Sequence, residues 1–208
     1  MIIAIDGTTA SGKGTLARKV AERYGLKRLD TGAIYRGVAL ALIDAGIDPT
    51  DAVQATLAAE ALDLEAIDEN RIRSGPVGTA ASIVSAFPAV RVALLEAQRR
   101  FAAAPQGAVL DGRDIGTVVC PTADVKLFVT ADLAVRAERR WKELQARGES
   151  STLAQVEAEI AARDKRDAER EVAPLRPALD AHLLDTTSLS IEAAAAVACR
   201  IIDAVLDP

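Results

Sequence analysis

The chain has 208 residues, of which 50% are hydrophobic and 26% are charged, a composition typical of one globular domain and unlike that of a disordered chain. The net charge of −5 and the aromatic content of 3% argue against a protein that grips duplex DNA or stacks single-stranded bases. Two cysteines and one histidine, His182, are too few for a disulfide framework or a zinc cluster, and nothing around His182 resembles a nucleophile motif.

No stretch of the sequence approaches the roughly 18 consecutive apolar residues that a membrane-spanning helix needs. The first residues, Met1 to Asp6, also lack the basic and long apolar segments of a signal peptide. We therefore expect a cytoplasmic protein that binds no membrane.

Along the chain, short apolar runs alternate with segments whose apolar residues recur at helical spacing. The expected strands are residues 2–6, 26–30, 108–111, 125–130 and 182–185. The expected helices are residues 15–24, 31–44, 50–62, 88–101, 132–147, 152–172 and 190–206. Residues 63–86 are predicted to be less regular, because Ser74-Gly75-Pro76 and Gly78 have turn chemistry. This alternation predicts an α/β fold with a doubly wound sheet of about five parallel strands.

The connection between the second and third expected strands is far longer than is usual in an α/β unit. We therefore predict a helical insert at about 31–107, beside the first strand–helix loop. A second helical excursion, rich in arginine, is expected at about 132–172.

The strongest motif is the frame G-x-x-x-x-G-K, which follows the first expected strand and opens the first helix. Glycines let backbone N–H groups converge on phosphate oxygens, the helix terminus adds partial positive charge, and Lys13 adds a cation for the β- and γ-phosphates. The motif predicts a P-loop NTPase-type fold that binds the phosphates of ATP. The residues predicted to do so are Gly7, Thr8, Thr9, Ala10, Ser11, Gly12, Lys13, Gly14 and Thr15.

The residue after the P-loop lysine is ordinarily a Ser or Thr that binds Mg²⁺, but Gly14 stands there and the hydroxyl follows on Thr15. In this the loop resembles small nucleoside monophosphate kinases more than GTPase switches or motor ATPases. We expect the nucleotide phosphates and water to hold Mg²⁺, with Thr15 and Asp111 as possible additional partners and no direct protein ligand required.

A second candidate site lies where the third expected strand ends. Asp111, Arg113 and Asp114 follow that strand directly, and ligands bind at the carboxyl ends of strands in open α/β sheets. Asp111 is a candidate for organising Mg²⁺ or its waters and Arg113 for clamping a phosphate. The alternative is an ordinary Asp-Gly turn with a local ion pair.

Two helices of the second excursion carry arginines at helical spacing, which are Arg136, Arg139 and Arg140 on one and Arg163, Arg166 and Arg170 on the other. Phosphoryl transfer depends mostly on positioning and positive charge, so a mobile arginine-rich lid would serve it. The alternative is a solvated helix surface on which the arginines pair with Glu138, Glu143 and Glu159.

Over nearly its whole length the sequence resembles the bacterial cytidylate kinases. The two most specific stretches of this resemblance are Asp30-Thr31-Gly32-Ala33-Ile34-Tyr35-Arg36 and Asp111-Gly112-Arg113-Asp114-Ile115-Gly116-Thr117-Val118-Val119. Further matching stretches are 5–7, 11–15, 81–82, 87–91, 163–167 and 172–175.

The resemblance implies a single P-loop kinase domain over residues 1–208, with an acceptor-binding insert at about 31–107 and a lid at about 132–172. It implies transfer of a phosphoryl group from ATP to CMP or dCMP, with Mg²⁺ as cofactor. Family members often carry a longer insert with extra strands, which the compact residues 63–74 lack the length to form. We expect small nucleotides as the only ligands, no nucleic-acid polymer and a monomeric protein.

The resemblance also assigns site residues. Catalytic roles fall to Lys13, Asp111, Arg113, Arg136, Arg140 and Arg163. Contacts to CMP fall to Thr31, Tyr35, Arg36, Ser82, Arg91, Arg113, Asp114, Arg163 and Asp167.

The chemistry of cytosine fits this assignment. Cytosine carries an amino donor at N4 beside acceptors at N3 and O2, so a carboxylate on Asp114 would accept from the amino group and Arg91 would donate to the ring. Uracil would turn a carbonyl toward Asp114 and leave both side chains unsatisfied.

Three other interpretations stay open at this point. A small P-loop kinase could act on another monophosphate or a small metabolite. A nucleotide-dependent switch would use the same loop, although a guanine-reading Asn-Lys-x-Asp stretch is absent from the sequence. An RNA-binding module could use the arginine faces, against which the acidic charge and few aromatics argue.

Overall fold

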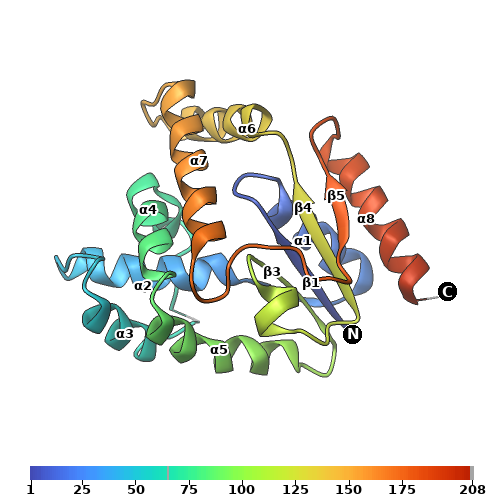
Figure 1. Ribbon diagram of the computed structural model, residues 1–208, viewed down its shortest axis with the longest axis horizontal. Coiled ribbons are helices and arrows are strands. Elements are labelled where there is room, and N and C mark those ends of the chain that lie inside the picture. Colours follow the sequence, from blue (N-terminus) through green and yellow to red (C-terminus); the bar gives the residue numbers. More distant parts are fainter. Residues whose placement is uncertain (65, 207–208) are drawn as a thin grey trace. The chain divides into compact units, whose positions relative to one another are not determined.

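The computed structural model describes residues 1–64 and 66–206 (Figure 1). Its chain forms two compact units, each with its own core. The first, here called the sheet unit, contains Met1–Arg28 and Ala102–Pro208, and the second, here called the helical unit, contains Leu29–Phe101. The functional roles predicted for an insert and a lid remain predictions.

A five-stranded sheet with the order β2-β3-β1-β4-β5 is the framework of the sheet unit, which contains all of it except the last two residues of β2. The strands are β1 (Ile2–Gly7), β2 (Lys27–Asp30), β3 (Ala108–Gly112), β4 (Val125–Thr130) and β5 (His182–Asp185). The strands β3, β1, β4 and β5 pair in parallel, with Ile5 of β1 opposite Asp111 and Leu127. The predicted α/β fold with a parallel sheet is thus confirmed.

Side-chain alternation along the strands separates two faces of this sheet. Ile3 and Ile5 of β1 pack with Leu127 of β4 into a core cluster that also contains residues of α1 (Lys13–Tyr24) and α8 (Ile191–Leu206). Asp111 lies at the same parity as the buried Val109 and therefore faces the α1 side, beside the loop that precedes this helix. The even-numbered residues of β1, which include Asp6, face the opposite side of the sheet.

The remaining long helices of the sheet unit are α6 (Leu133–Ala146) and α7 (Leu153–Glu169), which pack through a small cluster that contains Leu144, Val156 and Ile160 (Figure 1). Thr152 and Gln155 form a capping box at the start of α7. The helix ends at Glu169 and not at the predicted 172, because Arg170 adopts an extended ψ of 136°.

The helical unit contains the helices α2 (Thr31–Asp44), α3 (Ala52–Glu60), α4 (Gly75–Val84) and α5 (Pro88–Ala102), and the short 3₁₀ turn η1 (Arg71–Arg73). The prediction of an irregular segment through residue 86 was wrong, because the turn residues Gly75 and Pro76 form the first turn of α4, where proline costs no hydrogen bond. Among the described residues no single helix is long and apolar enough to cross a membrane, although α4 and α5 together reach that composition with a 100° bend between them.

On the face of the sheet opposite α1, the carboxylate of Asp6 holds the π-helical turn η2 (Ile115–Val119). Its two oxygens accept hydrogen bonds of 2.8 Å from the backbone N–H groups of Ile115 and Gly116. Burial raises the pKa of Asp6 to about 7, the two amide donors oppose that rise, and the neighbouring Asp114 adds to it. The structure thus contains a buried carboxyl group that titrates near neutrality.

We predict that the Asp6 carboxyl makes the free energy of unfolding fall as pH rises toward neutrality. Its pKa is about 7 in the folded chain against an ordinary 3.8, so between these values the folded state holds one proton more than the unfolded state. The slope approaches about 1.4 kcal/mol per pH unit in that window. Chemical denaturation of the wild type and of Asp6→Asn from pH 4.5 to 8 measures it, and a difference between the two proteins that is constant with pH would contradict the prediction.

Candidate active site

The loop between β1 and α1 has the backbone geometry of a phosphate cradle. Gly7 lies so close to β4 that a Cβ atom there would be 2.0 Å from the Val129 carbonyl oxygen, and the N–H of Thr8 donates to that oxygen at 3.2 Å. Gly12, which precedes the first residue of α1, has a φ of 87°, and Ala10 has a φ of 58°. The loop therefore has two left-handed positions, one of which is occupied by a residue with a side chain.

Polar groups of this loop are poised for an anionic ligand. The helix α1 begins at Lys13, so its first N–H groups and the positive end of its dipole face the loop. The Lys13 ammonium group lies 3.3 Å from the carbonyl oxygen of Thr8. Among the described residues, the buried hydroxyl oxygens of Thr8 and Ser11 have no hydrogen-bond partner. Buried polar atoms of this kind are normally satisfied, so these two hydroxyls fit a ligand that brings phosphate oxygens.

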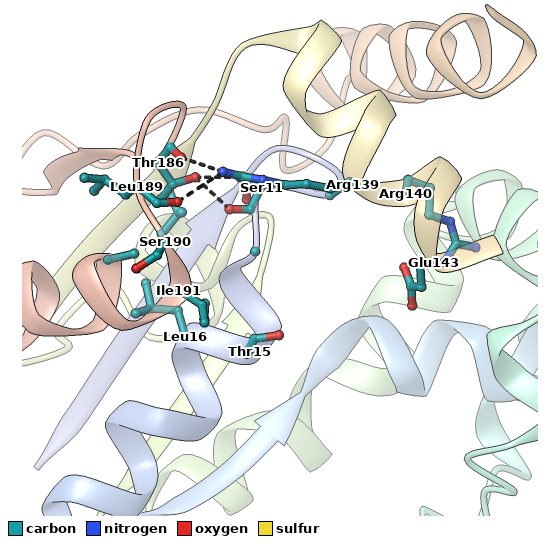
Figure 2. A pocket seen from close by; sticks show the side chains of 14 residues that line it. Ser11, Thr15, Leu16, Arg139, Arg140, Glu143, Thr186, Leu189, Ser190 and Ile191 are labelled. Atoms are coloured by element: carbon teal, nitrogen blue, oxygen red, sulfur yellow. Dashed lines mark hydrogen bonds and ion pairs between the residues drawn. The ribbon is translucent and has the colours of Figure 1, made fainter. Parts of the chain in front are cut away.

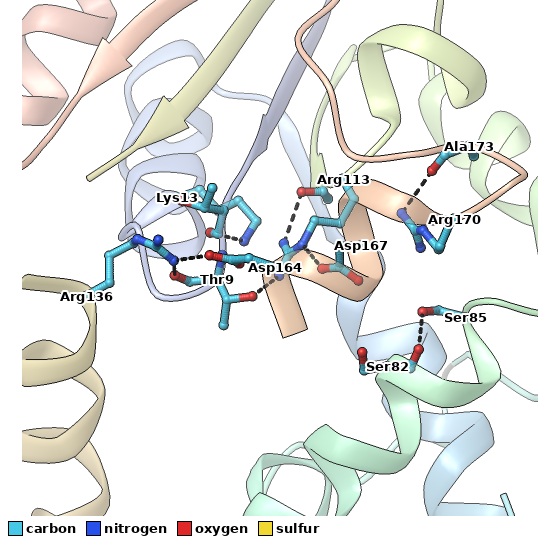
Figure 3. A network of polar contacts seen from close by, with 12 residues as sticks. Thr9, Lys13, Ser82, Ser85, Arg113, Arg136, Asp164, Asp167, Arg170 and Ala173 are labelled. Atoms are coloured by element: carbon cyan, nitrogen blue, oxygen red, sulfur yellow. Dashed lines mark hydrogen bonds and ion pairs between the residues drawn. The ribbon is translucent and has the colours of Figure 1, made fainter. Parts of the chain in front are cut away.

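Thr9, in the middle of the loop, receives contacts from three other elements of the sheet unit (Figure 3). Arg136 of α6 donates to its carbonyl oxygen at 3.0 Å, and Arg113, which follows β3, donates to its hydroxyl at 3.0 Å. The N–H of Thr9 donates to Asp164 of α7 at 3.2 Å, and Asp164 also pairs with Arg136 at 2.5 Å. Two of the predicted arginines therefore meet at the phosphate loop.

Arg113 also binds the predicted CMP contact Asp167, with 2.8 Å between Nε and the carboxylate. Asp167 is buried, which by itself would raise the pKa of its carboxyl group, but the positive charges of Arg113, Arg163 and Arg170 together lower that pKa below its ordinary value. The carboxylate is therefore ionised at neutral pH and holds the Arg113 guanidinium in place.

Asp111 at the end of β3 is buried and lies on the α1 side, where a Cβ atom at Gly14 would be 3.6 Å from its Oδ2. Arg28 of β2 donates from Nε to its Oδ1 at 3.1 Å, and a second guanidinium nitrogen lies 3.0 Å from the same oxygen. The predicted carboxylate is thus beside the phosphate loop and is neutralised by an arginine that the sequence analysis did not single out.

A cavity of about 450 Å³ lies beside the phosphate loop, between α6 and the segment that follows β5 (Figure 2). The predicted Arg140 lines it together with Thr15, and donates to Glu143 at 2.9 Å. Arg139 also lines this cavity, and its guanidinium is hydrogen-bonded to the hydroxyl and the carbonyl oxygen of Thr186. A cavity of this size accommodates a nucleoside.

In the helical unit, the predicted CMP contacts Arg91, Tyr35 and Ser82 take part in ring and hydrogen-bond contacts within that unit. The guanidinium of the buried Arg91 lies 5.5 Å from the ring centroid of Tyr35 and donates to the Ser85 carbonyl at 3.2 Å. Ser82 is buried, and its carbonyl accepts from the Ser85 hydroxyl at 3.1 Å (Figure 3).

The other predicted residues of the helical unit lie at the start of α2. Arg36 pairs at 2.7 Å with Asp30, which also caps the helix through the N–H of Ala33, and Thr31 is buried in the same turn. Asp114, which belongs to the sheet unit, is buried at the start of η2.

Three residues with roles at this site were not predicted, and these are Arg28, Asp164 and Thr186. Arg139 was predicted as one of the lid arginines, but its partner Thr186 was not, and Asp164 was included only in the matching stretch 163–167. Nothing in the sequence around Arg28 indicated that it would bind Asp111, and nothing around Thr186 indicated that it would bind the Ser11 carbonyl.

Known proteins resemble this chain over nearly its full length. It matches the family model described as cytidylate kinase over residues 3–204. Proteins named cytidylate kinase from Rhodopseudomonas palustris (strain BisB18) and Nitrobacter winogradskyi are 58% and 57% identical to it, over 99% of this chain and 97% of each relative. One named cytidylate kinase from Brucella suis is 56% identical over 99% of this chain and 94% of the relative.

Solved structures support the fold alone. An uncharacterized protein from Eubacterium ventriosum superposes with a TM-score of 0.58 at 15% identity and covers 98% of both chains. The protein TT1252 from Thermus thermophilus gives a TM-score of 0.50 at 23% identity, over 100% of this chain and 98% of that chain. The full-length match of the sequence, with a phosphate loop of the required geometry, shows that this chain belongs to the cytidylate kinase family.

Proposed function

We propose that this protein transfers the γ-phosphoryl group of ATP to CMP or dCMP and releases ADP with CDP or dCDP. The observation that carries this proposal is the phosphate loop, where buried hydroxyls of Thr8 and Ser11, the Lys13 ammonium group and the guanidinium groups of Arg113 and Arg136 gather. The family assignment supplies the class of reaction, and the arrangement of charge around the loop suits it.

The arginines and Lys13 would act by electrostatics. In phosphoryl transfer, negative charge spreads over the oxygens of the migrating group, and fixed positive charge stabilises it. Arg113 and Arg136 are already held by the carboxylates of Asp167 and Asp164, so little reorganisation would be required when the phosphates bind. Arg140 and Arg163 are proposed to add positive charge to the same groups. The accepting phosphate oxygen of CMP is ionised, so the reaction needs no general base.

Cytosine recognition is proposed to depend on Ser82, Arg91 and Asp114. The Arg91 side chain is held by stacking against Tyr35 and by its hydrogen bond to Ser85, which suits a donor that must keep one direction. Asp114 would accept from the N4 amino group. For the phosphate and sugar of CMP we propose contacts from Thr31, Tyr35, Arg36, Arg113, Arg163 and Asp167.

Mg²⁺ is proposed to bind chiefly through the nucleotide phosphates and water. Within the described part of the chain, no three acidic, imidazole or thiol side chains gather into a group that could hold a metal. Mg²⁺ typically keeps several waters and uses one or two carboxylates with substrate phosphates. For such an outer contact we propose the carboxylate of Asp111, which lies beside Gly14, with the Thr15 hydroxyl as a second candidate. The ion would supply charge compensation for the β- and γ-phosphates.

The structure weighs against the RNA-binding alternative. Arg136 is only 6% exposed and binds the backbone of the phosphate loop, so the α6 arginines do not form a free basic face. Arg139 is likewise engaged with the segment after β5. The monomeric state and the cytoplasmic location remain predictions.

A coupled assay with ATP, Mg²⁺ and a panel of nucleoside monophosphates tests the proposed function. We expect kcat/KM for CMP and dCMP to exceed that for UMP and AMP, by a factor on the order of 10⁴ at most, because the wrong base leaves hydrogen-bonding groups unsatisfied. Greater turnover of AMP, UMP or a non-nucleotide acceptor would refute CMP as the substrate.

We predict that Arg91→Met and Asp114→Ala impair the use of CMP and leave the KM for ATP within about twofold of the wild type. Each change removes a charged hydrogen-bonding partner of the base and should lower kcat/KM for CMP by about 100-fold. The controls are Arg100→Met on the same helix as Arg91 and Asp132→Ala, whose side chain makes no cap hydrogen bond. Equal losses for ATP and CMP would mean that these two residues only hold the fold.

We predict that Lys13→Ala lowers kcat by a factor on the order of 10² to 10³, because it removes a cation that stabilises charge in the transition state. Lys19→Ala is the matched control, since Lys19 lies on the same helix and pairs at 3.7 Å with the exposed Glu192. Steady-state rates with saturating ATP and CMP provide the measurement. A Lys13→Ala protein with wild-type kcat would contradict the assignment of the loop.

A further inference from the structure

Thr186, just after β5, links the phosphate loop to α6 through a buried hydroxyl group. Its Oγ1 lies 3.0 Å from the carbonyl oxygen of Ser11 and 3.1 Å from that of Thr130. Arg139 donates to this same hydroxyl oxygen at 3.1 Å and to the Thr186 carbonyl at 2.7 Å (Figure 2). One side chain therefore meets the end of β4, the phosphate loop and a helix of the arginine-rich excursion.

The direction of the hydroxyl hydrogen follows from these contacts. A threonine hydroxyl has one hydrogen to donate and lone pairs that accept. Arg139 occupies a lone pair, so the hydrogen must point toward one of the two carbonyls. The Thr130 carbonyl already accepts the backbone N–H of Thr186 at 2.8 Å. We therefore assign the hydroxyl hydrogen of Thr186 to the Ser11 carbonyl oxygen as its acceptor.

Holding the Ser11 carbonyl also fixes the next amide group. The carbonyl of Ser11 and the N–H of Gly12 belong to one planar trans peptide unit and point in opposite directions. Gly12 has a φ of 87° and no side chain, so its backbone could rotate to other conformations at little steric cost. A hydrogen bond on the Ser11 oxygen keeps that oxygen turned toward Thr186 and therefore keeps the Gly12 N–H turned away from Thr186.

We propose that Thr186 is a positioning residue that orients the Ser11–Gly12 peptide for the phosphates of the donor, with Arg139 orienting the Thr186 hydroxyl in turn. The inference rests on the proposed function in that it takes a triphosphate as the ligand of the loop. It assigns Arg139 to the support of the loop, whereas its neighbours Arg136 and Arg140 are proposed to contribute charge to the reaction.

Three variants test this role. Thr186→Val keeps the shape of the side chain and removes the hydroxyl, whereas Thr186→Ser keeps the hydroxyl. Thr187→Val is the matched control, because Thr187 lies in the same segment but its hydroxyl bonds Asp185 and the backbone of Asp132. The measurements are the KM values for ATP and CMP, kcat, and the Kd of inorganic tripolyphosphate, which has phosphates and no base.

We expect Thr186→Val to weaken ATP and tripolyphosphate by the same factor of about 10, with the KM for CMP within about twofold of the wild type. Thr186→Ser and Thr187→Val should stay within about twofold of the wild type for every ligand. Unchanged ATP and tripolyphosphate binding in Thr186→Val would overturn the proposal. It would also be overturned if ATP were weakened and tripolyphosphate were not, since Thr186 would then only shape the cavity beside the loop.

If Thr186→Val fails to fold, as judged by thermal unfolding, Arg139→Lys replaces it. This change keeps the positive charge and loses the fork of donors that orients the hydroxyl, so we expect a smaller loss of tripolyphosphate affinity, and no loss would overturn the proposal. The two proposals fail separately. A wild-type protein that does not phosphorylate CMP would refute the proposed function, whereas the tripolyphosphate comparison decides the role of Thr186 without any acceptor.

Discussion

The backbone of the phosphate loop is held from outside by side chains, and the rest of the site depends on this support. Glycine-rich backbone has many accessible conformations, yet a cradle must present its amides in one arrangement. Arg136 fixes the carbonyl of Thr9, Asp164 its amide and Arg113 its hydroxyl. Because these side chains come from α6, α7 and the end of β3, the loop is held to all three elements at a single residue.

Charge balance explains why so many ionised groups tolerate this burial. An isolated buried guanidinium or carboxylate would be costly to desolvate, but each of the arginines at Thr9 has a carboxylate partner within the sheet unit. Arg136 pairs with Asp164, and Arg113 pairs with Asp167. The lowered pKa of Asp167 is the electrostatic signature of the same arrangement. A bound triphosphate would meet guanidinium groups whose positions are already set, which is the condition for electrostatic catalysis.

The sequence predicted those parts of the molecule that depend on local pattern. The five strands, the glycine-rich loop and the helix after it follow from apolar runs and turn residues that are neighbours in the chain. The start of α4 was missed because Gly75-Pro76 suits a turn and a first helical turn equally well. Arg28 beside Asp111 and Thr186 beside Ser11 are partners that are 83 and 175 residues apart. Only the register of the sheet brings such residues together.

The alternation of side chains along the strands also distinguishes Asp6 from Asp111, two carboxylates that occupy the same kind of sequence pattern. Asp6 and Asp111 both end a buried strand and precede a glycine, yet they face opposite sides of the sheet. Asp111 meets a guanidinium beside the phosphate loop, whereas Asp6 accepts hydrogen bonds from backbone amides of η2 and experiences the repulsion of Asp114 and a weaker attraction to Arg113. The pKa of Asp6 is raised because its burial outweighs the opposing effects of the two amide donors and Arg113, and its hydrogen bonds to Ile115 and Gly116 give it a structural role in holding η2. Asp114 directly precedes η2. The position of this proposed cytosine contact therefore depends on Asp6, which lies on the face of the sheet opposite α1.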